Sequence, residues 1–465
     1  MEERRATQEN SRQPAALRTL SRVGAPSGLS RVREAARRGK EVQFTSLLHH
    51  VTAARLKESF RALNRKAAPG VDGVTWEDYE AHLEERIRSL HERVQRGTYH
   101  ALPSRRAYIA KPDGGWRPLG VAALEDKVVQ HALATILTEI YEADFMGFSY
   151  GFRPERGAHD GLDALWVSLM HRKVSYLLDA DIQDYFNTID HGYLVQFLKQ
   201  RIQDRRVLRL IEKWLRAGVL EHGEWSETKQ GTAQGAVISP LLANVFLHYV
   251  FDTWAHAWRR GKARGEVYVV RYADDFVVGF QYREDAERFL KELGERMRTF
   301  GLSLHPTKTR LIEFGRFAAS NRSKRGVGKP ETFNFLGFTH MASTDRIHGR
   351  FYVRRWTIAK RLRTKLHEIR LELRKRMHQT LDEQGPWLRS VVQGYYNYFA
   401  VPGNMQRLSC FRDQVMRSWL VILRRRSQRS RLPWRTFRLL ARTWIPPPRV
   451  LHPYPHHRFY AKHPR

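Results

Sequence analysis

The sequence predicts an α+β core followed by a basic, largely helical region, and three observations support this fold class. Between residue 104 and about residue 340, short apolar runs typical of strands alternate with patterns typical of helices. From residue 356 onward, "WTIAKRLRTKLHEIRLELRKRM" and "LRSVVQGYYNYFA" have the spacing of basic amphipathic helices. With 465 residues, of which 42% are hydrophobic, the chain is long enough for two or three structural units with a sizeable core.

The chain carries a large excess of positive charge, with a formal net charge of +33 and a pI of about 10.6. Such a field attracts polyanions, of which nucleic acid is the common one and an anionic membrane surface the rival. No apolar run is long enough to span a bilayer, so we expect nucleic-acid partners and no membrane. Residues 1–50 are expected to form a basic N-terminal extension that begins with a polar, Arg-rich arm.

Signals for targeting and metal binding are weak. The N-terminal "MEERRATQENSRQP" lacks the apolar core of a secretory signal, so we expect a cytoplasmic protein associated with the nucleoid or with RNA. The single cysteine, Cys410, excludes an internal disulfide and a Cys-rich zinc site. His452, His456 and His457 leave a metal site open, although a basic His/Pro tail that contacts nucleic acid is the simpler interpretation.

The first candidate site lies in "VVRYADDFVVGF", residues 269–280. Two apolar, β-branched runs flank Asp274 and Asp275, which predicts a hairpin with two acids at its turn. Aspartate favours turns and is well solvated there, so the pair alone does not indicate a function.

A second strand that ends in an acid strengthens the interpretation of Asp274 and Asp275 as functional residues. "SYLLDADIQDYFNTIDH" begins as an apolar strand that runs into Asp181, and an acid at the end of a buried strand is costly unless its charge is offset. If this strand lies beside the hairpin, Asp181, Asp274 and Asp275 converge. Such a cluster suits two Mg²⁺ ions, which prefer carboxylate, water and phosphate oxygens. Two metal ions can support an in-line phosphoryl displacement.

Two further segments supply groups that a triphosphate substrate requires. "AYIAKPDGGWRPLGV" places Lys111 and Arg117 on either side of a turn, where they are suited to anionic phosphates, although an ordinary basic hairpin has the same pattern. In "TKQGTAQGAVISPLLANVFLHYV", Gly235 allows close backbone approach and Gln234 is placed to contact a base edge. The alternative here is a glycine loop before a core helix that begins at Ser239 and Pro240.

At this point the sequence resembles the group II intron-encoded reverse transcriptase/maturase family, in its bacterial form without an HNH endonuclease domain. The resemblance rests on seven motifs in order across residues 104–338: "KPDGGWRPLG", "SYGFRPERGAHDGLDAL", "DADIQDYFNTIDH", "QGTAQGAVISPLLANVFL", "RYADDFVVGF", "GLSLHPTKTRLIEF" and "FNFLGF". It implies a right-hand polymerase fold, with fingers and palm built on an antiparallel sheet, followed by an α-helical thumb or maturase region.

The resemblance implies a role for each matching residue. Asp181, Asp274 and Asp275 match the catalytic, metal-binding aspartates, which hold two Mg²⁺ ions, with Mn²⁺ as a substitute. The nucleotide-binding residues that match are Lys111, Arg117, Phe186, Gln234, Gly235 and Lys308. Within that set, Phe186 matches the aromatic residue that crowds a 2′-hydroxyl, and Lys111 and Arg117 match residues that hold the triphosphate. Residues 333–338 match a separate hairpin that grips the primer.

The resemblance also implies domain boundaries. Fingers and palm are expected at 51–345, the thumb or maturase domain at 346–425, and a basic nucleic-acid-binding tail at 426–465. Ala233 stands where the family commonly has proline and Ala236 where it commonly has glycine. Both residues are small, so we expect them to adjust the loop without abolishing activity.

The implied function is that of an RNA-directed DNA polymerase that binds its intron RNA, assists splicing and copies the intron into DNA. The expected partners are structured intron RNA, an RNA template with a DNA primer, target DNA and dNTPs. Two alternatives remain open: an RNA-binding splicing cofactor with a relic polymerase core, and a related polymerase adopted for defence or repair.

Overall fold

A computed structural model of the protein describes residues 27–110, 115–345, 348–426 and 432–463. The chain divides into two compact units. Unit 1 comprises Met1–Gly161, Leu178–Val278 and Arg283–Leu311, and unit 2 comprises Leu162–Leu177, Gly279–Tyr282 and Ile312–Arg465. Lys111, expected to bind the triphosphate, lies outside the described residues.

The centre of unit 1 is helix α6 (Leu124–Asp144), most of whose residues are buried. Helix α2 (Ser27–Arg38) packs against it through buried Leu29, Val32 and Ala36, and Arg33 Nη2 donates to Glu139 Oε1 at 2.8 Å. The described part of the expected N-terminal extension is therefore folded onto unit 1. Further helices of unit 1 are η1 (Leu48–His50), α3 (Ala53–Ala62), α4 (Trp76–Glu80), α5 (Leu83–Arg96), α8 (Tyr185–Thr188), α9 (His191–Lys199), α10 (Arg205–Arg216) and α13 (Arg283–Thr299).

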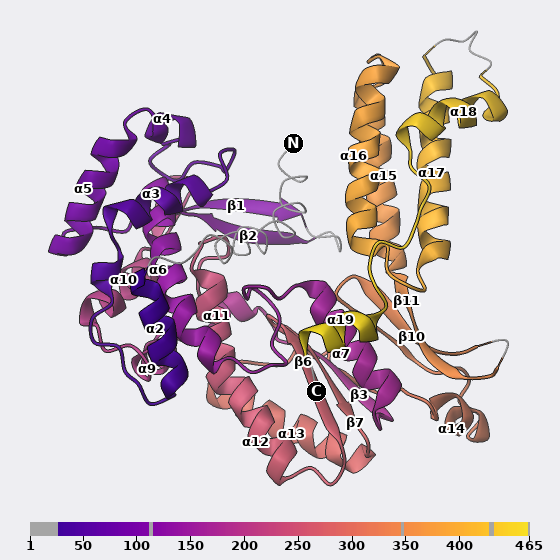
Figure 1. Cartoon of the computed structure of the whole chain (residues 1–465), viewed down its shortest axis with the longest axis horizontal. Helices are drawn as coiled ribbons and strands as arrows, with labels where there is room; N and C mark the ends of the chain where they lie inside the picture. The colour runs from indigo at the N-terminus through magenta and orange to yellow at the C-terminus, as the bar shows by residue number, and fades with distance from the viewer. Residues whose placement is uncertain (1–26, 111–114, 346–347, 427–431, 464–465) are drawn as a thin grey trace. The chain divides into compact units, whose positions relative to one another are not determined.

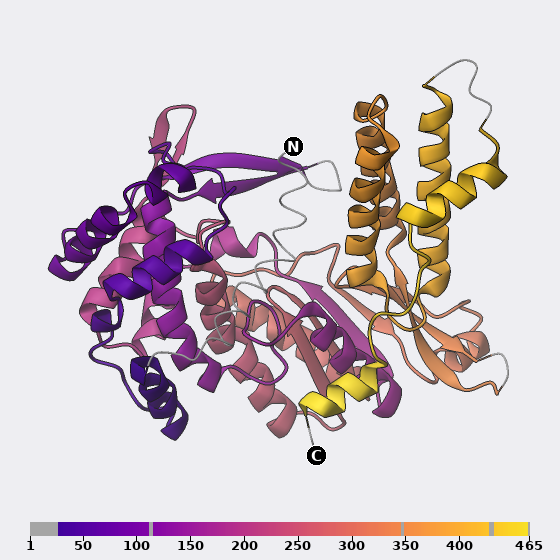
Figure 2. The ribbon, with the colours of Figure 1, turned by 45° about the horizontal axis from the view of Figure 1, so that its top comes forward.

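A four-stranded sheet in unit 1 has the order β2-β1-β4-β5. Its strands are β1 (Ser104–Ala110), β2 (Trp116–Val121), β4 (Val219–Glu221) and β5 (Glu224–Ser226). Strands β1 and β2 pair antiparallel from Arg105↔Val121 to Ala110↔Trp116, while β4 joins β1 in parallel. The hairpin of β1 and β2 extends from the rest of unit 1, as both ribbon views show (Figures 1 and 2).

The second four-stranded sheet has the order β6-β7-β3-β8 and carries the candidate site. Its strands are β3 (Tyr176–Asp181), β6 (Val267–Tyr272), β7 (Asp275–Phe280) and β8 (Arg310–Glu313). A continuous run of helix belongs to unit 1: α11 (Ser239–Leu247), the π-helical segment η2 (His248–Asp252) and α12 (Thr253–Gly261). Ser239 and Pro240 open α11, as expected from the sequence.

Unit 2 contains a three-stranded antiparallel sheet and a bundle of helices. The sheet has the order β11-β10-β9, with strands β9 (Thr332–Phe335), β10 (Phe338–Thr344) and β11 (Phe351–Thr357). Helices α15 (Ala359–Lys375), α16 (Leu381–Phe399) and α17 (Met405–Arg424) lie side by side in both ribbon views (Figures 1 and 2). Their shared core includes Tyr395, Tyr396 and Trp419 together with Phe437 of α18 (Trp434–Trp444). Unit 2 also contains α14 (Ala318–Lys324) and most of α7 (Ala158–His171).

The C-terminal segment of unit 2 is held by internal contacts. In α19 (Pro455–Lys462), Arg458 Nε donates to Asp163 Oδ2 at 2.5 Å, and Asp163 also accepts from Arg355 Nη1 at 3.3 Å. The ring of His456 stacks on Trp166, and the backbone N–H of Leu451 donates to Ala400 O at 2.9 Å. This part of the expected nucleic-acid-binding tail therefore uses many of its polar groups within the protein.

A helix that crosses a bilayer must be both long and apolar. No helix within the described residues meets both requirements.

Candidate active site

The turn between β6 and β7 has a backbone conformation that its neighbours hold in place. Ala273 adopts a φ of +55°, in the left-handed region that residues other than glycine rarely occupy, and Asp274 follows it. The preceding segment of unit 1 pairs with the end of β6, since Tyr150 N donates to Arg271 O at 2.8 Å. A Cβ on Gly151 would lie 2.4 Å from Ala273 N. Glycine at that position therefore lets this segment close over the turn.

A buried ion pair fastens the same turn from below. Arg271 and Asp252 are both fully buried, and the guanidinium binds the carboxylate in a bidentate manner, with Nε–Oδ1 at 2.7 Å and Nη2–Oδ2 at 2.5 Å. Nη1 of Arg271 donates to Ala273 O and to Asn244 Oδ1, both at 3.0 Å. The amide of Asn244 in turn donates to Gly151 O at 2.7 Å. One network therefore holds both sides of the turn.

Two aspartates of β3 have different partners. Lys308 Nζ lies 2.7 Å from Asp181 Oδ2, while Arg310 Nη2 lies 3.5 Å from Asp179 Oδ2. Burial raises the pKa of Asp179 to about 6, against the opposing effect of Arg310. Lys308, expected to contact the nucleotide, is thus paired with one of the expected metal ligands.

Asp274 is electrostatically coupled to Asp181 and to the expected phosphate-binding arginine. Burial is the main reason why the pKa of Asp274 is raised, and the negative charge of Asp181 raises it further. Arg117, which is exposed on β2, and Arg271 lower it. The structure therefore brings Asp181, Asp274 and Arg117 into one electrostatic neighbourhood. Asp275, the first residue of β7, is exposed.

The expected convergence of three carboxylates is only partly present. Within the described ranges, no three His, Cys, Asp or Glu side chains gather as a group that could hold a metal ion. The carboxylate of Asp181 is paired with Lys308, and Asp275 on the strand is exposed, whereas Asp274 in the turn is half-buried. The chemistry of the donors still suits a divalent cation, because carboxylates are ligands that such ions prefer, and burial together with the charge of Asp181 raises the pKa of Asp274.

The glycine loop before α11 is fastened to β2 and to α8. Gly120 N of β2 donates to Gln234 O at 2.7 Å, and a Cβ on Gly235, whose φ is +115°, would lie 3.0 Å from Gly120 O. Thr232 N donates to Phe186 O at 2.7 Å. The loop therefore joins two expected nucleotide-binding elements, the strand that follows the hairpin turn and the short helix that carries Phe186.

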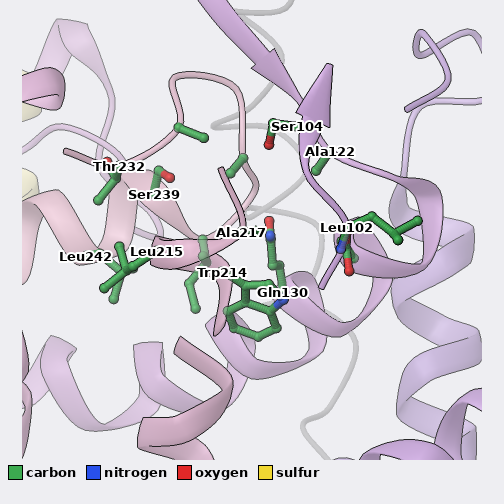
Figure 3. Close-up of a pocket in the computed structure, with 14 residues that line it drawn as sticks. Leu102, Ser104, Ala122, Gln130, Trp214, Leu215, Ala217, Thr232, Ser239 and Leu242 are labelled. Atoms are coloured by element: carbon green, nitrogen blue, oxygen red, sulfur yellow. The ribbon is translucent and has the colours of Figure 1, made fainter. Parts of the chain in front are cut away.

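A small cavity of about 20 Å³ lies beneath this loop (Figure 3). Its lining combines loop residues Thr232, Ala233 and Ala236 with Gln130 of α6. Gln130 Oε1 accepts from Val237 N at 3.0 Å, so a buried side chain of the central helix supports the loop. The volume suits about one water molecule.

The supporting residues were not predicted from the sequence. Arg271, Asp252, Asn244 and Gln130 each position a backbone segment of the site without being expected there. One signal was present for Arg271, because a single arginine directly follows the apolar run "VYVV", three residues before Asp274. A buried arginine needs a carboxylate partner, but its sequence position does not identify which one.

Comparison with known proteins agrees with this geometry. A family model described as "Reverse transcriptase (RNA-dependent DNA polymerase)" matches residues 109–340. Protein YkfC of Escherichia coli (strain K12) is 35% identical over 45% of this chain and 62% of its own length. The group II intron-encoded protein LtrA of Lactococcus lactis subsp. cremoris is 35% identical over 41% of this chain and 32% of its own. An uncharacterized 91 kDa protein in the cob intron of Schizosaccharomyces pombe is 29% identical over 47% and 28%, respectively.

The reverse transcriptase model covers the part of the chain that contains the β6–β7 turn, the glycine loop and β3. The chain spans less than two thirds of the length of each of these three relatives. The expectation drawn from the order of the sequence motifs is confirmed: the chain contains a reverse transcriptase domain and is a relative of group II intron-encoded reverse transcriptase/maturase proteins.

Proposed function

We propose that the protein is an RNA-directed DNA polymerase that also binds a structured intron RNA, assists its splicing and copies it into DNA. Its partners would be intron RNA, an RNA template with a DNA primer, target DNA and dNTPs, in the cytoplasm near the nucleoid. The observation that carries the proposal is the neighbourhood of Asp181, Asp274 and Arg117 at a braced turn within a reverse transcriptase domain.

Asp181 and Asp274 are the residues that would hold divalent cations, Mg²⁺ or in its place Mn²⁺, with Asp275 as a further ligand. When bound, two such ions would activate the primer hydroxyl and stabilise the leaving oxygen. The raised pKa of Asp274 supports this role, because a cation offsets the burial and the like charge that disfavour its ionised form. Lys308 keeps the charge of Asp181 compensated in the meantime.

The remaining residues would bind and select the nucleotide. Arg117 and Lys111 would contact the triphosphate, whose charge requires cationic groups. Phe186 would exclude a 2′-hydroxyl, and Gln234 with Gly235 would line the new base pair. The contacts from the loop to Phe186 and to β2 would keep these groups in register with one another.

Primer extension on an RNA template tests the polymerase assignment. Asp274→Asn should abolish extension, because it removes one charged ligand while preserving the shape of the side chain. Asp179→Asn is the matched control, since Asp179 lies on the same strand as Asp181 but pairs with Arg310, and it should retain extension. Undiminished extension by Asp274→Asn would overturn the site assignment.

The same variant also tests the separation of the two activities. Asp274→Asn should bind intron RNA as tightly as the unaltered protein, because phosphate contacts depend on basic side chains. A filter-binding titration with intron RNA measures this affinity. A parallel loss of RNA binding and extension would show that the substitution damages the fold.

A further inference from the structure

The β9–β10–β11 sheet of unit 2 has one buried and one partly exposed face. On β11, Val353, Arg355 and Thr357 are buried, while Tyr352, Arg354 and Trp356 alternate with them and are half-buried. This period of two places the latter three side chains on one face. In register, they are next to Ser343, Met341 and Thr339 of β10, respectively. The strand positions of this outer face therefore carry positive charge and aromatic rings but no acid.

Two guanidinium groups converge on one indole at the edge of this face. The guanidinium carbon of Arg354 lies 5.1 Å from the centroid of the Trp356 ring, and that of Arg407, from α17, lies 4.5 Å from it. Arg354 also lies over the ring of Tyr352, and its Nε donates to the phenol oxygen at 2.9 Å. Cation–π attraction holds each cation against the ring, but it leaves the repulsion between the two cations in place.

Buried hydrogen bonds fix the position of Arg407 relative to β11. Asn404, immediately before α17, is fully buried, and its Oδ1 accepts from Thr357 N at 3.1 Å. Its amide donates to Thr357 Oγ1 and to Phe399 O, both at 2.9 Å. The end of β11 and the start of α17 therefore meet at a defined place, where both ribbon views show the helices adjoining the sheet (Figures 1 and 2).

Neighbouring arginines differ in how their charge is compensated. Arg355 faces inward and pairs with Asp163. Among the ion pairs of the described residues, none includes Arg354 or Arg407. Nε of Arg407 is buried and, in the described part of the chain, has no hydrogen-bond partner. Two fixed cations that no described acidic side chain neutralises form an arrangement that an external anion would complete.

We propose that Arg354, Trp356 and Arg407 form a binding site for a phosphodiester of a nucleic-acid strand. This inference rests on the proposed function, because a polymerase that copies RNA requires such a strand. The planar guanidinium groups supply paired donors for phosphate oxygens, and the indole orients both of them before the strand binds. The phosphate belongs to either the RNA template or the DNA primer.

The salt dependence of binding tests the phosphate contact. The full chain is titrated, without nucleotides, into a fluorescent DNA primer annealed to an RNA template. Arg354→Gln and Arg407→Gln should each weaken binding and reduce the slope of log K against log [salt] by about 0.7–0.9 for each phosphate that the variant no longer neutralises. Arg298→Gln on α13, which removes one exposed arginine elsewhere, is the control and should change both quantities much less. Equal slopes for all three variants and the unaltered protein would overturn the proposal.

The indole separates a binding role from a merely structural one. Trp356→Phe keeps a ring under both guanidinium groups and should retain most of the affinity, whereas Trp356→Leu should lose it. Thermal unfolding midpoints of both variants are measured alongside. If Trp356→Leu binds as tightly as Trp356→Phe, the ring does not organise the site and the proposal is wrong.

Neutral backbone linkages identify the strand and test the site without relying on synthesis. Single methylphosphonate linkages are placed at successive positions of the primer or of the template. The unaltered protein should lose affinity at one position, and Arg407→Gln should show no further loss at that position. If such a position is found in the primer, the bound phosphate belongs to the DNA primer, and if it is found in the template, the phosphate belongs to the RNA. If neither strand has such a position, the proposed site is wrong. Because no catalysis is measured, a failure of primer extension would count against the proposed function and leave this result unchanged.

Discussion

Replacing Arg271 with methionine is expected to loosen the turn that carries Asp274. The substitution removes two charge-assisted bonds to Asp252 and one bond each to Asn244 and Ala273. It also leaves the fully buried carboxylate of Asp252 without its cation. Removing one partner from a buried pair costs about 3–5 kcal/mol, which corresponds to roughly 10²- to 10⁴-fold in the opening equilibrium of the turn.

Hydrogen exchange at the backbone amides of β6 and β7 measures this opening, and single-turnover primer extension measures its effect on activity. The double variant Arg271→Met/Asp252→Leu separates the stability of the turn from its effect on primer extension. Replacing both charges with apolar groups should recover most of the protection, because no unpaired charge remains. Extension should stay impaired, since the carbonyl of Ala273 still lacks its donor.

Two outcomes would refute this reasoning. One is a loss of protection in Arg271→Met of less than about 0.5 kcal/mol, within the range of an ordinary surface change. The other is wild-type extension by the double variant, which would show that the ion pair stabilises the fold without positioning the turn. Arg298→Gln serves as the control for removing one positive charge.

Three further predictions concern single positions. Gly151→Ala should strongly reduce primer extension, because the added methyl group would lie 2.4 Å from the backbone nitrogen of Ala273. Gly147→Ala is the control and should retain extension, because no atom lies within 4 Å of its added Cβ. Equal activity of the two variants would contradict the steric argument. Phe186→Val should lower the ratio of dNTP to rNTP efficiency by removing the wall beside the sugar, and an unchanged ratio would place that wall elsewhere. Burial lowers the pKa of His340 to about 3, below the unfolded value of about 6.5, so its contribution to stability is present above pH 6.5 and is lost as the pH falls toward 3. His340→Phe should therefore reduce the drop in the free energy of unfolding between pH 7 and pH 5, measured by urea denaturation, by up to about 2 kcal/mol, and an identical drop would count against this titration.

Local sequence patterns predicted the elements on which the site depends. Continuous apolar runs marked the strands before Asp181 and around Asp274, and the structure places both in one sheet. Amphipathic spacing marked the helices of unit 2, and Tyr395 and Trp419 are buried in their core, which is the commoner fate of aromatics in such helices. These features depend on a short window of sequence.

Contacts between distant segments could not be predicted in the same way. Asp252 and Arg271 are separated by a helix, and the positions of the π-helical turn and of the end of β6 determine that their side chains meet. Similarly, the pairing of Lys308 with Asp181 joins residues 127 positions apart. A motif indicates which residue types a site contains, but partner choice depends on tertiary packing.

The anchoring of α19 affects how shortened versions of the protein should be interpreted. Deleting the residues from Pro446 onward would remove Arg458 from Asp163 and expose the face of Trp166 that His456 covers. Such a deletion would damage unit 2 as well as remove basic residues. A loss of RNA binding after truncation would then have two explanations of equal standing. Substitution of an exposed side chain such as Arg449 preserves the internal contacts, and is the sounder way to learn what this segment binds.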